Sequence, residues 1–214
     1  TTFSGAAAGF FLGTAVYAGF GYRSFAILLA FFVLGSAATR LGAKRKMEMG
    51  IAEGRRGARG WREAVANVLA AAFFSLLAIT TPEQAAFLMA LVAALAEAAG
   101  DTVASETGKW ASSRAWLITN FKPVPPGENG GVSPTGTAAG FGASGMVVAL
   151  ASGLGLVKGW EIVIVLLAAI AGNAADSLLG ATLERRGWLT NGIVNFAGTS
   201  IAGALALVYG LHYR

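Results

Sequence analysis

The feature that most constrains this chain is a series of long apolar runs, each close to the length of a membrane-spanning helix. About 20 predominantly apolar residues cross the bilayer core as one helix. The runs are bounded by charged residues, Gly or Pro and cover residues 3–21, 24–39, 64–80, 85–100, 136–156, 161–180 and 193–210. The pattern therefore predicts an all-α, polytopic transmembrane bundle with about seven spans.

Composition agrees with a membrane location. Of the 214 residues, 55% are hydrophobic and only 13% are charged, whereas a soluble domain carries about a quarter charged residues. Seven spans and their connections use up the length, so we expect residues 1–214 to form a single transmembrane domain. The first apolar run has no basic segment before it, and we expect no cleavable signal peptide.

Basic residues set the expected orientation. Thirteen of the sixteen Lys and Arg residues fall within residues 40–62, 109–122 and 185–186. With seven spans these connections share one face, and the positive-inside rule makes that face cytoplasmic. We place the N-terminus outside and expect a multi-pass protein in the plasma membrane of a prokaryote or in a chloroplast membrane. The net charge of +5 then has a topological cause, and we expect no nucleic-acid partner.

Carboxylates gather at the same face, and the orientation rule does little to explain them. The chain has no cysteine, so any metal must have oxygen ligands, which favours Mg²⁺ or Ca²⁺. Glu97, Asp101 and Ser105 follow one another at i, i+4 and i+8 and share one helix face. Two carboxylates one turn apart suggest a bound cation or substrate; alternatively, Asp101 and Glu106 pair with basic residues at the interface.

A second polar stripe runs along the span of residues 161–180. Its members, at helical spacing, are Asn173, Asp176, Ser177, Gly180 and Glu184. Lipid cannot satisfy such a stripe, so it must face the bundle interior or a wet cavity, with Asp176 as the best single candidate for a functional residue. The alternative is helix packing through hydrogen bonds, which we also consider the simplest role for Asn195 in the last span.

A third segment, residues 122–137, is a Pro- and Gly-rich connection. It ends in a helix-start pattern, with Ser133 as N-cap and Pro134 as the first helical residue. A Gly-rich backbone at a helix N-terminus can receive phosphate, although such a segment is more often only a loop. The basic connection with Lys44, Lys46 and three arginines could bind nucleotide or lipid phosphates, or anchor to anionic headgroups.

Taken together, these segments resemble the phytyl-phosphate kinase family of integral membrane proteins. The resemblance covers nearly the whole chain and is most specific over residues 129–145. It is carried by Gly35-Ser36, Thr39-Arg40, Asp101-Thr102, Ser105-Glu106, Gly108-Lys109, Gly130-Gly131-Val132-Ser133, Thr135-Gly136 and Gly172 to Ser177. Parts of the chain are more distantly similar to dolichol kinases and CDP-diacylglycerol synthases, which use CTP, although the synthases tend to carry an acid where this chain has Asn173.

The resemblance implies CTP-dependent phosphorylation of a prenyl monophosphate, such as phytyl or geranylgeranyl phosphate, to the diphosphate with Mg²⁺. It makes Asp101, Asp176 and Lys109 catalytic and gives the metal the ligands Asp101, Glu106, Asp176 and Glu97. The substrate-binding residues that it implies are Arg40, Lys46, Gly130, Gly131, Ser133, Thr135, Gly136, Thr137, Asn173 and Asn195. Phosphoryl transfer suits a chain without Cys or a well-placed His, because positioning and electrostatics do most of the work.

Two other functions remain open from the sequence. A cytidylyltransferase would join CMP to the lipid phosphate and release pyrophosphate. An ion-coupled transporter would use Glu97 and Asp176 as coupling residues, although the polar groups cluster at one interface instead of at the midplane. Small residues on the helix faces also permit a homodimer.

Overall fold

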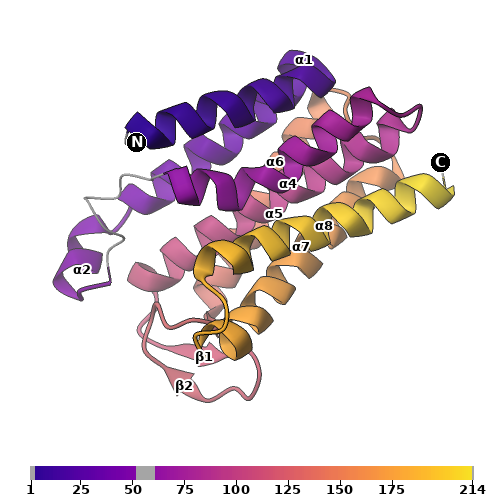
Figure 1. Ribbon diagram of the computed structural model, residues 1–214. Helices are drawn as coiled ribbons and strands as arrows, with labels where there is room; N and C mark the ends of the chain where they lie inside the picture. Colours follow the sequence, from indigo (N-terminus) through magenta and orange to yellow (C-terminus); the bar gives the residue numbers. More distant parts are fainter. Residues whose placement is uncertain (1–2, 52–60, 214) are drawn as a thin grey trace.

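The computed structural model describes residues 3–51 and 61–213 and consists almost entirely of helices (Figure 1). The helices are α1 (Phe3–Arg40), α2 (Ala43–Glu48), α4 (Trp61–Ile79), α5 (Gln84–Ala111), α6 (Pro134–Gly153), α7 (Trp160–Leu179), the π-helix η1 (Gly180–Glu184) and α8 (Asn191–Tyr213). The strands are β1 (Ala115–Leu117), β2 (Pro123–Val124) and β3 (Gly131–Val132). The predicted all-α membrane bundle is confirmed.

Helix α5 is the central helix of the bundle. It packs against α1, α4, α6, α7 and α8, and every residue from Met89 to Gly100 is buried. Small residues allow this close packing: a Cβ added to Gly140 on α6 would lie 2.7 Å from the carbonyl oxygen of Gly100 on α5. Backbones in direct contact are the usual way in which membrane helices associate. The end of α5 is thereby held between the ends of its neighbours.

Among the described residues, six helices are long and apolar enough to cross a membrane, but the first of them folds back on itself. Gly21 interrupts α1 with φ 69° and ψ −156°. The Ser24 hydroxyl donates to the carbonyl oxygen of Val16 at 3.0 Å, whereas residues eight apart in a straight helix are separated by about 12 Å. The two arms of α1 match the predicted runs at residues 3–21 and 24–39, so seven crossings remain our prediction.

The hairpin relates the N-terminus to the first basic connection. Two arms precede residues 40–62, so the chain returns to the end of the bundle where it began, and Phe3 lies at the same end as α2 and the sheet (Figure 1). An even number of crossings always restores the starting side. With seven crossings, an external N-terminus and a cytoplasmic face for the basic connections are therefore incompatible. The positive-inside rule then predicts that both are cytoplasmic.

The predicted connection after α5 contains a small sheet that the sequence did not reveal. Its strands are antiparallel in the order β2-β1-β3, with Trp116 of β1 opposite Pro123 on one side and Val132 on the other. The predicted helix start is confirmed, because the Ser133 hydroxyl accepts a hydrogen bond from the amide of Gly136 at 3.1 Å and Pro134 begins α6. Arg55, Arg56, Arg59 and Arg214 lie outside the described residues.

Candidate functional site

A cavity of about 190 Å³ lies at the end of the bundle that carries the sheet. Helices α4, α5, α7 and α8, the start of α6 and the turn between β2 and β3 all contribute to its wall. Residues proposed from the sequence that line it are Asp101, Glu106, Lys109, Gly130, Gly131, Ser133, Gly136, Thr137, Asn173, Asp176 and Asn195. Segments far apart in the sequence thus meet in one polar chamber.

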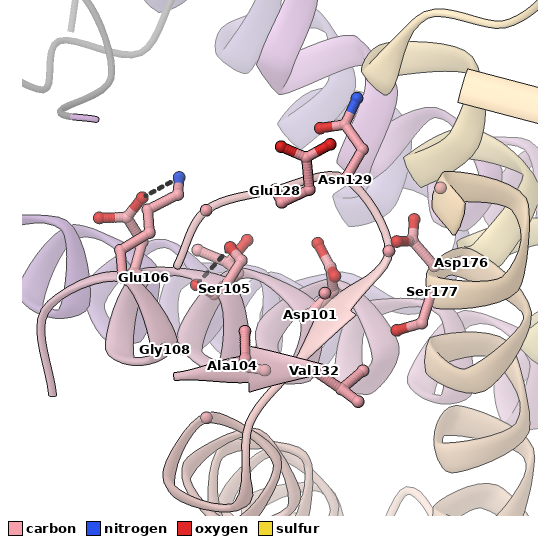
Figure 2. A pocket seen from close by; sticks show the side chains of 18 of the residues that line it. Asp101, Ala104, Ser105, Glu106, Gly108, Glu128, Asn129, Val132, Asp176 and Ser177 are labelled. Atoms are coloured by element: carbon pink, nitrogen blue, oxygen red, sulfur yellow. Dashed lines mark hydrogen bonds and ion pairs between the residues drawn. The ribbon is translucent and has the colours of Figure 1, made fainter. Parts of the chain in front are cut away.

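Two carboxylates face each other across the cavity. Figure 2 shows Asp101 of α5 and Asp176 of α7 pointing into the same space, beneath the turn that carries Glu128 and Asn129. Their charges repel one another, and Glu184 adds to the repulsion at Asp101. Asp176 is only 9% exposed, and its Oδ2 has no hydrogen-bond partner. An orphaned buried carboxylate oxygen opposite a second carboxylate suits a hard cation such as Mg²⁺.

The polar stripe predicted on α7 is confirmed as a wall of the cavity. All five of its members line the chamber, and the last turn of the stripe is the π-helix η1. A π-helical turn is rare and is frequently found at functional sites. Among the residues that the structure describes, no group of three or more His, Cys, Asp or Glu side chains forms a ready-made metal site. A metal held between Asp101 and Asp176 would need oxygens from a substrate as well.

Glu106 has a different role from the metal ligand implied by the resemblance. Its Oε2 pairs with the ammonium of Lys46, and its Oε1 lies 3.0 Å from Nζ of Lys109. Lys46 also donates to the carbonyl oxygens of Ala38 and Thr39, at 3.3 and 2.8 Å. Both oxygens of Glu106 are therefore engaged by lysines, and the alternative of an ion pair with Lys109 is confirmed for this residue.

Four other residues implied by the resemblance do not line the cavity. Lys46 is 2% exposed and lies behind the wall, where it ties α2 to α5. Arg40 is exposed at the end of α1, and Thr135 is exposed and bonded to the Ser112 hydroxyl. Glu97 lies deeper in the bundle and is 1% exposed.

The structure adds two residues of α4 that the sequence did not single out. Glu63 and Asn67 both line the cavity. The amide of Asn195 donates to Oδ1 of Asn67 at 3.5 Å, and the amide of Asn67 donates to the carbonyl oxygen of Glu63 at 2.8 Å. An asparagine inside an otherwise apolar span was the available signal, because lipid cannot satisfy its amide.

The Gly-rich turn is docked on η1 by close backbone contact. Gly130 has φ +71°, and a Cβ on it would lie 2.2 Å from the backbone nitrogen of Ala181. Nε of Arg185 lies 3.3 Å from Oε1 of Glu128, which adds an ion pair between this turn and the end of η1. The amides of Gly131 and Gly136 already donate within the chain. The turn therefore shapes the cavity, and these two amides are not open for phosphate.

Comparison with known proteins gives a family for the whole chain. The model of the integral membrane protein family DUF92 matches residues 1–203. The chain belongs to this family, and the resemblance to phytyl-phosphate kinases seen in its motifs is confirmed at the family level.

Three relatives illustrate the similarity. The uncharacterized membrane protein sll0875 of Synechocystis sp. is 40% identical over 199 residues, which cover 92% of this chain and 77% of the relative. The chloroplastic Protein VTE6 of Arabidopsis thaliana is 34% identical over 212 residues, covering 96% of this chain and 64% of VTE6. Protein PGR of the same plant is 32% identical over 227 residues, covering 92% and 77%. The chain therefore spans less than two thirds of VTE6, and no solved structure matches it.

Replacing Glu106 with Gln should destabilise the protein by about 3–5 kcal/mol, because it leaves the buried ammonium of Lys46 without its carboxylate. Thermal or denaturant unfolding in detergent measures the change. The exposed Glu48→Gln variant is the control and should unfold like the unaltered protein. Adding Lys46→Met to Glu106→Gln should restore part of the loss, and a double variant no more stable than Glu106→Gln would contradict this role.

Replacing Gly130 with Ala should detach the turn from η1, because the new methyl group would collide with the backbone of Ala181. Gly155→Ala is a matched control: Gly155 has φ +72°, but a Cβ there has nothing within 4 Å. Both variants carry the strain of a positive φ, so the difference between them isolates the collision. Proteolysis of the turn should be faster in Gly130→Ala, and equal rates in the two variants would contradict the docking.

Proposed function

We propose that the protein is a prenyl-phosphate kinase, which transfers the γ-phosphoryl group of CTP to the phosphate of a prenyl monophosphate. The observation that carries the proposal is the pair Asp101 and Asp176, which face each other in one cavity, Asp176 with an unpartnered oxygen. The family resemblance and the similarity to VTE6 support a kinase of this class. The specific donor, metal and acceptor are part of the proposal.

In this proposal Asp101 and Asp176 hold Mg²⁺ together with phosphate oxygens of the nucleotide. Mg²⁺ commonly binds through one or two carboxylates and substrate phosphates, which fits a site that lacks a third convergent carboxylate. When bound, the ion neutralises charge on the transferring phosphoryl group. Glu106 is not among the ligands, because both of its oxygens contact lysines.

Lys109 is the best-placed cation for the nucleotide phosphates. It lines the cavity, and its partner Glu106 also neutralises Lys46, so the three side chains together carry one net positive charge. Lys109 and the two carboxylates line the same cavity, so a phosphate bound by Lys109 would share that cavity with the metal. Gly130, Gly131 and Gly136 also line this cavity.

The acceptor follows from the position of the cavity. The chamber lies at one end of helices whose outer faces are apolar, with side chains such as Phe141 and Leu178 exposed toward the membrane. A prenyl chain can lie in the bilayer while its phosphate reaches the chamber at the interface. The attacking phosphate oxygen is already ionised near neutral pH, so the reaction requires positioning more than a strong general base.

The direct test is to incubate purified protein in detergent with Mg²⁺, γ-labelled CTP and geranylgeranyl or phytyl monophosphate. Label recovered in a lipid diphosphate supports the proposal. An unlabelled CDP-lipid would establish a cytidylyltransferase instead. If no prenyl phosphate is turned over, the ion-coupled transporter becomes the favoured alternative.

In the same assay Asp176→Asn should lower turnover by roughly 10²-fold or more, the loss typical of removing a group that stabilises developing charge. Glu161→Gln is the control, because Glu161 lies in the first turn of α7, at the opposite end from the cavity. In the absence of divalent ions both variants should retain the unfolding temperature of the unaltered protein. Full turnover in Asp176→Asn would contradict the assignment.

A further inference from the structure

Glu97 is a fully buried carboxylate that the proposed reaction does not use. It lies on α5 one turn before Asp101 and is 1% exposed. A Cβ on Gly198 of α8 would lie 2.6 Å from its Oε1, and a Cβ on Gly172 of α7 would lie 2.9 Å from its Cγ. The side chain therefore occupies a slot between α7 and α8 that exists only because both positions are glycine.

Three residues with an unpartnered side-chain oxygen lie on the helices that form this slot. Among the described residues, only four buried side-chain polar atoms lack a hydrogen-bond partner, and three of them are Glu97 Oε1, Asp176 Oδ2 and Asn195 Oδ1. Asn195 precedes Gly198 by one turn on α8, and the Cβ of Asp176 lies 3.2 Å from the position that a Cβ on Gly198 would occupy. Leaving a buried polar atom unpaired costs about 1–3 kcal/mol, so three at one place indicate a common ligand.

The chemistry of the three oxygens selects a cation. Two are carboxylate oxygens and the third is an amide oxygen, which are the ligands preferred by hard divalent ions. The ion pairs found among the described residues bring no Lys or Arg to Glu97 or Asp176. We infer that Glu97, Asp176 and Asn195 bind a divalent cation on the floor of the cavity, independently of nucleotide and lipid. The two carboxylates balance the double charge of this cation. Because its three ligands come from α5, α7 and α8, the cation links these helices.

This ion is distinct from the metal that enters with the nucleotide, although Asp176 lies beside both. The floor site is built by the chain alone, so it fills before any substrate binds. It also explains how a carboxylate as deep as Glu97 is tolerated inside a membrane bundle, where an isolated charge is costly. The inference concerns binding only and would survive failure of the proposed reaction.

The test is thermal unfolding of the purified full chain in detergent, without CTP or lipid, across a titration of Mg²⁺ after treatment with EDTA. A ligand that binds only the folded state raises its stability in a saturable way. The unaltered protein should gain several degrees, and Asp101→Asn should gain as much, since Asp101 is not a floor ligand. Glu97→Gln and Asn195→Ala should lose most of the gain.

Each other outcome would overturn the inference. If Mg²⁺ does not change the unfolding temperature of the unaltered protein, and Glu97→Gln unfolds at the same temperature, then Glu97 carries a proton in place of a metal. If Asp101→Asn loses the rise in unfolding temperature, the ion binds at the reaction site and not on the floor. If K⁺ raises the unfolding temperature as much as Mg²⁺ does, the site does not select a divalent ion. Because Glu97→Gln is a buried change, Mn²⁺ binding to the unaltered chain by electron paramagnetic resonance is the second measurement. One bound ion per chain without nucleotide supports the site, and none refutes it.

Discussion

The cost of placing carboxylates inside a membrane bundle shapes this structure more than any other interaction. The protein meets that cost in different ways. Glu106 is neutralised by two lysines, one of them almost completely buried. Asp101 faces a polar cavity at the end of the bundle, opposite Asp176. Glu97 and Asp176 retain unpartnered oxygens, which a cation can satisfy. Among the described residues these two are the acids with a buried, unpartnered oxygen, and we propose functional roles for both.

Glycines make this arrangement of charges possible. Gly140 and Gly100 bring α6 against α5, while Gly172 and Gly198 leave the slot for Glu97. Gly130 brings the turn into backbone contact with η1 and so closes the cavity on the side of the sheet. The central position of α5 follows, because a helix surrounded on all sides needs neighbours with small contact residues. Its last three turns then present Asp101, Ser105 and Lys109 to residues of α4, α6, α7, α8 and the turn between β2 and β3.

Apolar run length predicted the helices well, because the bilayer fixes how many residues a span needs. The α7 stripe and the N-cap Ser133 were also predictable, since helical periodicity and capping are local properties of the sequence. Long-range features were not: the partner of Glu106, the contribution of Asn67 and the docking of Gly130 each depend on distant segments. The small sheet escaped prediction because its strands have only two or three residues. The predicted external N-terminus is inconsistent with seven spans and cytoplasmic basic connections, because two crossings precede the first of these connections.

The central claim is that the chamber between Asp101 and Asp176 receives the nucleotide, and the absence of cysteine from the chain permits a direct test. Ser177→Cys places a single thiol on the cavity wall. Thr80→Cys places one on the exposed turn that follows α4, and Thr80 does not line the chamber. Labelling with a water-soluble maleimide should become slower at Ser177→Cys when CTP and Mg²⁺ are added, with no change at Thr80→Cys. Equal labelling of Ser177→Cys with and without nucleotide, at concentrations that support turnover, would contradict the account.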